Sequence, residues 1–152
     1  MPRSAKAEAA RIALLIGNSD YSGEAALPNA ASDASLMESV FADLGFKTYF
    51  VQDLIARTGS DPLQALEEAA IRADIAVIYY TGHGMAADGQ NCLIPVVGAV
   101  GSEQDVRDTA VPISRLLSIL AKASYFGMVL FNACRTNPWS QQIERDSGLR
   151  GI

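Results

Sequence analysis

With 152 residues, 49% of them hydrophobic and 19% charged, the chain has the length and composition of one soluble globular domain. Its net charge of -5 and the lack of any Lys/Arg run argue against a nucleic-acid partner. No segment has the roughly 18 apolar residues that cross a bilayer, and residues 1–10 lack the apolar run of a secretory signal, so a cytoplasmic protein without a membrane partner is expected.

Apolar runs alternate with helix-like spacing along the chain, and turn-forming residues separate them. The first run, at 11–16, ends at Gly17 and Asn18 and is predicted to be a buried strand, followed by a turn-rich loop. The run at 74–80 is continuous and apolar, as expected for a strand covered on both faces. Further strands are predicted at 46–51, 92–97 (short, interrupted by Pro95) and 125–131, and helices at 30–44, 62–73 and 112–123.

Two of the predicted helices have apolar residues at three- and four-residue spacing, which indicates the faces that pack on a sheet. Glycines at three positions predict that residues 81–91 form a loop. The predicted apolar faces consist of Leu36, Val40, Phe41 and Leu44 in the first helix and of Ile113, Leu116, Leu117 and Leu120 in the last.

Strands that alternate with helices imply right-handed crossovers and a mostly parallel sheet covered on both faces. The expected fold is therefore an α/β three-layer sandwich. Ligands of such sheets bind beyond the carboxyl ends of the strands. The only histidine, His83, follows strand 74–80, and Cys134 follows strand 125–131, so both are expected at the same edge of the sheet.

His83 and Cys134 have the chemistry of a nucleophile and its base. A thiol with an ordinary pKa of about 8.5 is mostly protonated at neutral pH and becomes reactive when an imidazole takes its proton. The N–H groups of Gly84 and Cys134 can together form an oxyanion hole. Each residue also has a simpler interpretation, since a lone histidine in a loop is often structural and a lone cysteine is often a packed side chain.

Position favours the catalytic interpretation, because both residues follow strands at one edge and glycines flank His83. His83 lies 51 residues before Cys134, near the spacing of about 50 in one class of cysteine peptidases. Four sequence motifs follow one another along the chain, and two of them contain the histidine and the cysteine: residues 79–84 (YYTGHG) and 131–135 (FNACR). The others are RIALLIGN at 11–18 and the segment from Leu27-Pro28-Asn29 through Asp33-Ala34 to Leu44-Gly45-Phe46.

Together these motifs resemble the large-subunit (p20-like) catalytic domain of the caspase and metacaspase clan, bacterial metacaspase (orthocaspase) type. The resemblance covers residues 11–139 and implies a caspase-like fold. It also implies a cysteine endopeptidase that works through an acyl-enzyme intermediate and cuts after Arg or Lys. In this resemblance Cys134 corresponds to the nucleophile, His83 to the base and the backbone of Gly84 to an oxyanion donor.

Asp33 corresponds, by the same resemblance, to one carboxylate of an acidic specificity pocket. Its alternative role is to complement the dipole at the start of a helix. Asn132 departs from the metacaspase pattern, which usually has Asp at this position. Asn keeps the shape and can accept a hydrogen bond, but the lost charge predicts either weaker selection of basic residues or a partly changed role for this position.

The resemblance requires no cofactor or metal, although some metacaspases need calcium, a hard cation that clustered carboxylates hold. Glu103, Asp105 and Asp108 form the dense acidic group between the two motifs, and a solvated loop explains them equally well. Cys92 is interpreted as a packed free thiol, and Trp139 either as a wall of the cleft or as a cap on the core.

The expected organisation is a tail at 1–10, a catalytic domain at 11–139 and a tail or inter-subunit linker at 140–152. The clan's fold, as the resemblance implies, has two more strands on a small-subunit segment. The sheet edge beside strand 125–131 is therefore expected to be unpaired and to bind that segment or a second copy of the chain. We interpret the chain as a processed or truncated large subunit, with Arg145 and Arg150 as candidate cleavage points.

Two other functions fit parts of the pattern. One is a non-catalytic caspase-homology module, or a processed large subunit that is inactive without its small-subunit segment; the intact Cys-His pair favours catalysis over it. The other is a nucleotide-binding flavodoxin-like domain, which needs a glycine-rich phosphate loop after the first strand, where this chain has GNSDYSG. For the favoured function the expected partner is a peptide or protein substrate.

Overall fold

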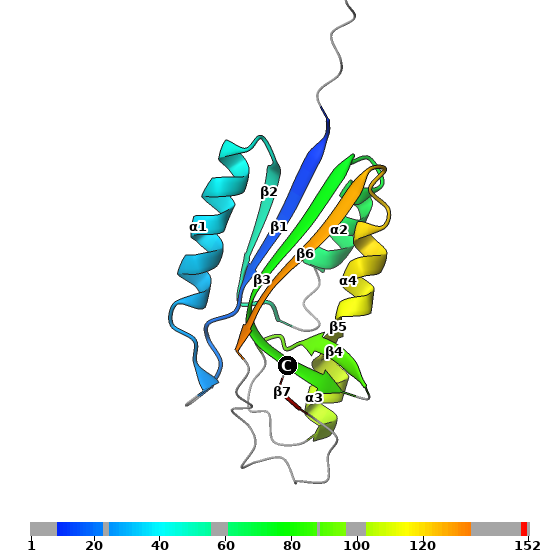
Figure 1. The fold of residues 1–152 in the computed structure, drawn as a ribbon. Helices are drawn as coiled ribbons and strands as arrows, with labels where there is room; N and C mark the ends of the chain where they lie inside the picture. Colours follow the sequence, from blue (N-terminus) through cyan, green and yellow to red (C-terminus); the bar gives the residue numbers. More distant parts are fainter. Residues whose placement is uncertain are drawn as a thin grey trace, which may run out of the picture.

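The computed structural model describes residues 9–22, 25–55, 61–87, 89–96, 103–134 and 150–151. The strands are β1 (Arg11–Gly17), β2 (Lys47–Gln52), β3 (Ile75–Ala87), β4 (Gln90–Leu93), β5 (Val111–Pro112), β6 (Phe126–Cys134) and β7 (Arg150–Gly151). The helices are α1 (Ala30–Asp43), α2 (Pro62–Ala70), α3 (Glu103–Thr109) and α4 (Ile113–Leu120). Helix α1 covers one face of a curled sheet, and α2 and α4 cover the other (Figure 1).

Four strands run parallel in the order β2-β1-β3-β6 and form the centre of the sheet. Parallel neighbours need long crossover connections, and the helices between the strands supply them. The predicted α/β three-layer sandwich with a mostly parallel sheet is confirmed, and so are the strands predicted for its centre.

Side chains of the central strands alternate between two apolar layers, because successive residues of a strand point to opposite faces. The layer beneath α2 and α4 contains Ile12, Leu14 and Ile16 of β1 with Ala76, Ile78 and Tyr80 of β3. The layer beneath α1 contains Ala13 and Leu15 of β1 with Val77 and Tyr79 of β3. Both faces of the central strands are therefore buried, which explains their continuous apolar sequence.

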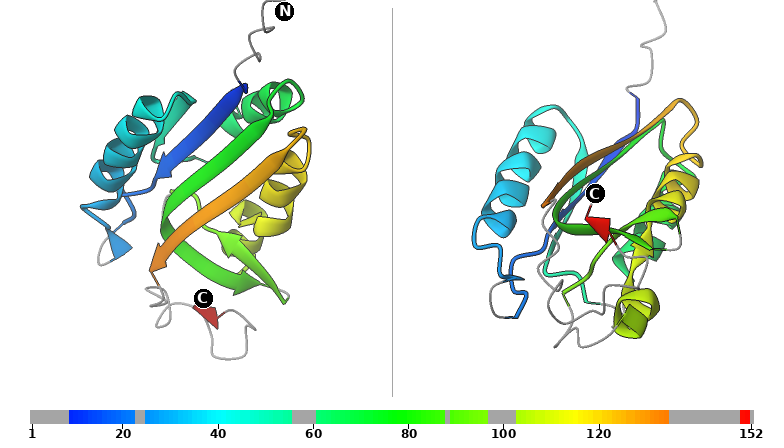
Figure 2. Two further views of the ribbon diagram at one scale, coloured as in Figure 1. Left: turned by 45° about the horizontal axis from the view of Figure 1, so that its top comes forward. Right: turned by 60° about the horizontal axis from the view of Figure 1, so that its bottom comes forward.

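Strand β3 runs past Tyr80 and carries His83 within it, so the predicted loop at 81–91 is wrong for most of its length. Up to His83 the strand pairs in parallel with β6, and from Gly84 onward it pairs antiparallel with β4 (Figure 2). Gly89, with a φ angle of 75°, lies between β3 and β4 and is the glycine that the turn requires.

The apolar face predicted for α1 is largely wrong. Phe41 is buried, but three of the predicted residues are exposed: Leu36, Val40 and Leu44. The buried face carries the small residues Ala30 and Ala34 instead. A Cβ on Gly17 would lie 2.7 Å from the Ala30 carbonyl oxygen and 2.8 Å from the Ala34 Cβ, so the start of α1 approaches β1 too closely for large side chains.

Two described segments differ from the expected loop and tail. The acidic residues near 105 lie in α3 rather than in a loop. Strand β7, within the predicted C-terminal tail, pairs antiparallel with Met85 and Ala86 of β3 (Figure 2). Trp139 and Arg145 lie outside the described residues, so their roles and the domain boundaries stay predictions. Within the described ranges, no helix has the length and apolar character needed to cross a membrane.

Leu116 and Leu117 are neighbours in α4 with opposite environments, which makes them a matched test of the core. Leu116 is fully buried, whereas Leu117, predicted to lie on the same face, is 54% exposed. We expect Leu116→Ala to lower the free energy of unfolding by about 2–5 kcal/mol, and Leu117→Ala by less than about 0.5 kcal/mol. Urea unfolding followed by circular dichroism measures both, and equal losses would contradict this orientation of α4.

Candidate active site

The carboxyl ends of the parallel strands meet at one edge of the sheet, the lower edge in Figure 1. His83 and Cys134 lie at this edge in adjacent parallel strands, where they are register partners. Neighbouring strands are about 4.8 Å apart, so the two main chains are close enough to serve one reaction centre. The side chain of Cys134 lies outside the described part of the structure.

The imidazole of His83 is buried, with only 3% of the residue exposed. Its Nε2 lies 2.6 Å from the carbonyl oxygen of Ala25, in the loop that follows β1. A carbonyl oxygen only accepts hydrogen bonds, so Nε2 carries the proton and donates it. In the neutral ring, Nδ1 is therefore the basic nitrogen.

Burial lowers the pKa of His83 below its ordinary value of 6.5, because an apolar environment disfavours the charged ring. The hydrogen bond to the Ala25 carbonyl opposes this shift, since it stabilises the protonated ring. With a lowered pKa the imidazole is neutral at neutral pH, which is the form that accepts a proton from a thiol.

Two buried tyrosines hold the main chain of His83. The His83 N–H donates to the hydroxyl oxygen of Tyr21 at 3.1 Å, and the His83 carbonyl accepts from the hydroxyl of Tyr80 at 2.6 Å. The Tyr21 hydroxyl donates to the carbonyl of Ile94 at 2.6 Å. The N–H of Ile94 in turn donates to the His83 carbonyl at 3.0 Å. Each hydroxyl proton therefore has an acceptor, and both main-chain polar groups of His83 are satisfied.

Gly82 leaves room for both hydroxyl groups. A Cβ at this position would lie 2.4 Å from the Tyr80 oxygen and 2.9 Å from the Tyr21 oxygen. Burial raises the pKa of both phenols, so they remain protonated donors at neutral pH. The glycine before His83 is thus a packing requirement of this network.

The loop that carries Tyr21 is anchored at the end of β2. The carboxylate of Asp53 accepts hydrogen bonds from the N–H groups of Ser19 and Asp20, at 2.7 and 3.0 Å. Asp53 has a φ angle of 56°, in the left-handed region that costs free energy for a residue other than glycine. The surrounding hydrogen bonds hold the chain in this sharp bend.

Asn18 is a second anchor for the same loop. Its side-chain oxygen accepts from the N–H of Leu54 at 2.8 Å, and its side-chain nitrogen donates to the Ile94 carbonyl at 3.1 Å. Asn18 is completely buried, so both bonds are needed to offset its removal from water. This side chain joins the ends of β1 and β2 to the segment that follows β4.

Gly84, the predicted oxyanion donor, is buried and lies opposite Leu93 of β4. It comes one residue after the pairing of His83 with Cys134, at the point where the antiparallel pairing of β3 with β4 begins. This position is close to the proposed reaction centre, and the donor role of its N–H stays a prediction.

Asp33 and Asn132 line one pocket of about 240 Å³, beside the pairing of His83 with Cys134. Asp33 comes from the first turn of α1 and Asn132 from β6, and Gly82 contributes to the lining. Both side chains are exposed, so a cation bound to the Asp33 carboxylate would remain in partial contact with water. The two residues predicted to bind substrate are therefore brought together next to the predicted catalytic pair.

Two other surface features, a groove beside β2 and the acidic residues of α3, do not contain the predicted catalytic residues. A larger groove of about 590 Å³ between β2 and α2 is lined by Phe50, Ile55 and acidic residues, and by none of the predicted catalytic residues. Among the residues that the structure describes, no group of three or more His, Cys, Asp or Glu side chains is arranged to hold a metal ion. Asp105 and Asp108 lie on the exposed surface of α3.

The groups that hold His83 are not among the residues predicted for the site, since the residues after β1 indicate only a turn-rich loop. The sequence position of Asn18 and Tyr21 could have indicated a role at the site, since both follow β1 at the same carboxyl edge as His83. The Ala25 carbonyl had none, because any residue type supplies a backbone acceptor.

Comparisons with known proteins agree with this fold. The caspase domain model of peptidase family C14 matches residues 10–151. The crystal structure of protein GSU0716 from Geobacter sulfurreducens has a similar fold, with a TM-score of 0.64 at 19% sequence identity. This match covers 91% of the present chain and 58% of that one, so the chain spans little more than half the length of that protein. No curated protein sequence matches the chain. The match to the family model over nearly all of the sequence shows that the chain belongs to the caspase domain family, peptidase family C14.

Proposed function

We propose that the chain is the catalytic domain of a cysteine endopeptidase of metacaspase type, with Cys134 as nucleophile and His83 as general base. The observation that carries the proposal is the register pairing of these two residues, together with an imidazole whose Nε2–H is held by the Ala25 carbonyl. Membership of a peptidase family supports peptide or protein substrates.

The reaction begins when the thiol proton moves to Nδ1 of His83 and the Cys134 sulfur attacks the carbonyl carbon of the scissile bond. The C–N bond then breaks, His83 returns the proton to the leaving amine, and a thioester remains on Cys134. Water attacks the thioester while His83 takes its proton, and the thiol is regenerated. The N–H groups of Gly84 and Cys134 donate to the oxyanion, which is usually a large contribution in acyl transfer.

Asp33 and Asn132 support cleavage after Arg or Lys. The Asp33 carboxylate gives the pocket a negative charge, and the Asn132 side chain adds a neutral acceptor. A guanidinium or ammonium group makes charge-assisted hydrogen bonds to a carboxylate, and these are stronger than neutral ones. Because Asp33 is exposed, water screens part of this attraction, so the preference for basic residues is moderate.

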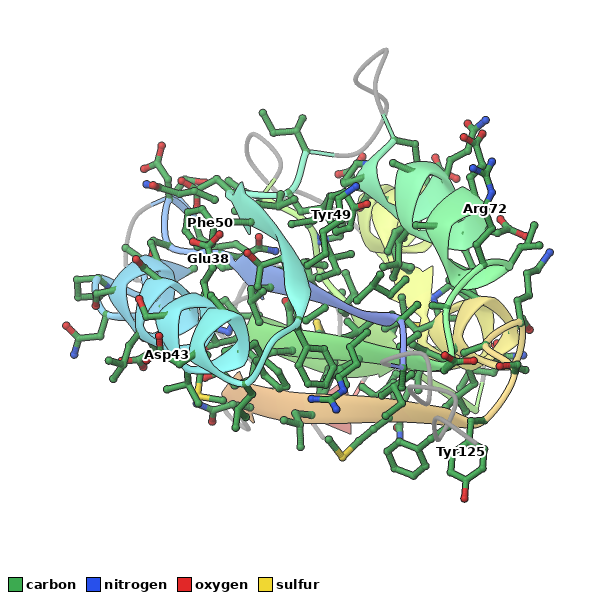
Figure 3. All side chains as sticks on the ribbon, turned by 90° about the horizontal axis from the view of Figure 1, so that it is seen from above. Glu38, Asp43, Tyr49, Phe50, Arg72 and Tyr125 are labelled. Atoms are coloured by element: carbon green, nitrogen blue, oxygen red, sulfur yellow. The ribbon has the colours of Figure 1, made fainter. Side chains whose placement is uncertain are left out.

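The position of β6 in the sheet favours a further binding partner. Among the described strands β6 pairs with β3 alone, so its other side is an edge of the sheet. Phe126, the first residue of β6, is 49% exposed, and Tyr125, just before the strand, is 87% exposed and projects away from the sheet in Figure 3. Apolar edge strands readily pair with another strand. In this proposal the β6 edge binds a strand of a small-subunit segment or of a second copy of the chain.

Cys134→Ala is expected to abolish hydrolysis of an Arg-containing peptide and to leave the fold intact, because the change from thiol to methyl is small. His83→Ala is expected to lower hydrolysis nearly as much, because groups that act as a unit fail together. Cys92→Ala is the control, since Cys92 is buried in β4 and the change in volume is small. An Arg-based chloromethyl ketone should label Cys134, as read by mass spectrometry. An active Cys134 variant together with an inactive Cys92 variant would refute the assignment.

Asp33→Asn is expected to lower kcat/KM for Arg substrates by about 5- to 10-fold, since it removes a partly exposed charge-assisted interaction worth about 1 kcal/mol. Asp43→Asn removes the same charge at the opposite end of α1 and should have no effect (Figure 3). A peptide library measures the preference directly. Selection of Asp at the cleavage position, or equal effects of the two variants, would exclude this pocket.

Phe126→Lys is expected to weaken self-association of the chain, because a charged residue on an edge strand opposes strand pairing. Leu36→Lys is the control, since Leu36 is 66% exposed on α1 and lies outside β6. Light scattering over a range of concentrations measures the mass. A wild-type chain that stays monomeric and also fails to bind an added small-subunit segment would rule out the β6 partner.

A further inference from the structure

We propose that Tyr21 is a positioning residue for His83: its hydroxyl fixes the main chain of His83, and its ring fixes the imidazole against the Ala25 carbonyl. This inference rests on the proposed function, in which His83 is the general base. Tyr21 lies in the loop after β1 and is 62 residues from His83 in the sequence, so the contact exists only in the folded protein.

The Tyr21 hydroxyl bridges His83 to the chain that follows β4. It accepts from the His83 N–H at 3.1 Å, donates to the Ile94 carbonyl at 2.6 Å and lies 3.2 Å from the Tyr80 hydroxyl. The bridge lies between the end of the β1–β3 pairing at Thr81 and the start of the β3–β4 pairing at Gly84. The regular ladder of the parallel sheet ends here, and a side chain provides the acceptor for the His83 N–H.

The ring of Tyr21 contacts the imidazole directly. The two ring centroids are 4.5 Å apart and the planes meet at 68°, an edge-to-face arrangement that aromatic pairs favour. Ala25, whose carbonyl binds Nε2, belongs to the same loop. One loop therefore contacts the imidazole through an aromatic ring and through a backbone acceptor, and together they limit its rotation.

Packing alone does not account for a tyrosine here, because phenylalanine fills the same apolar space. Tyr21 is 3% exposed, and a buried hydroxyl is unfavourable unless it is hydrogen-bonded. Gly82 leaves the space that this hydroxyl occupies, since a Cβ there would lie 2.9 Å from it. The loop is also anchored independently of His83, through Asp53 and Asn18. These features give a rigid support, which a general base requires.

Tyr21→Phe keeps the ring and removes the hydroxyl, and Tyr79→Phe makes the same change in the layer beneath α1, on the other face of β3. His83 is the only histidine of the chain, so NMR assigns its ring nitrogens directly. Above the His83 pKa, we expect a single Nε2–H tautomer in the wild type and in Tyr79→Phe, and a mixture of tautomers in Tyr21→Phe. Exchange of the His83 amide should become faster by about 10-fold or more in Tyr21→Phe but not in Tyr79→Phe, because only Tyr21→Phe removes the acceptor of this N–H.

In a peptide assay, Tyr21→Phe should lower kcat on the order of 10-fold and leave KM unchanged, because the base is displaced while the Asp33 pocket stays intact. Gly82→Ala keeps Tyr21 in the sequence but displaces the Tyr21 and Tyr80 hydroxyls sterically. It should therefore give the same mixture of tautomers and the same faster exchange of the His83 amide. A Tyr21→Phe protein with the wild-type tautomer and exchange rate would overturn the positioning role. A wild type that lacks peptidase activity even with an added small-subunit segment would refute the proposed function instead, and the NMR comparison would still decide the role of Tyr21.

Discussion

The geometry of the site depends on the carbonyl oxygen of Ile94. The Tyr21 hydroxyl donates to it at 2.6 Å and the Asn18 amide at 3.1 Å, while the Tyr80 hydroxyl, whose proton makes the shorter bond to the His83 carbonyl, lies 3.2 Å from it. These groups belong to the loop after β1 and to β3, so one acceptor joins the ends of two parallel strands to the segment after β4. Buried main-chain groups must find partners within the protein, so a shift of any of these side chains would leave a polar atom unsatisfied. His83 is held within this network through its N–H and its carbonyl.

Apolar packing around the network makes it stable. The Tyr80 ring lies in the layer beneath α2 and α4, where it stacks on Phe131 of β6 with centroids 4.9 Å apart, while its hydroxyl reaches the polar groups. In such a low-dielectric environment a satisfied hydrogen bond is strengthened and an unsatisfied group is penalised. The position of His83 is therefore coupled to the packing of the whole sheet, and its lowered pKa follows from the same burial.

The two halves of the candidate site differ in their exposure to solvent. His83 is enclosed and held on several sides, whereas Asp33 and Asn132 face an open pocket at the start of α1. This division fits the proposed chemistry, in which a general base must keep one orientation and a specificity pocket must admit and release a side chain. The close approach of α1 to Gly17 places Asp33 at the carboxyl edge of the sheet, so the packing of small residues also determines where the pocket lies.

The parallel core and the edge that carries His83 and Cys134 could be predicted from the amino-acid sequence, because apolar runs, turn residues and the order of elements are local properties of the chain. The continuation of β3 through His83 depends on contacts between distant segments, since β6 and β4 provide the partners that keep the strand extended despite its glycines. The buried face of α1 was also decided by packing, because alanines fit the close approach to β1 and the larger apolar residues stay outside. Tyr21 and the Ala25 carbonyl contact His83 although they lie about 60 residues away from it in the sequence. Such a contact between a distant loop and a strand has no local sequence pattern from which it could be predicted.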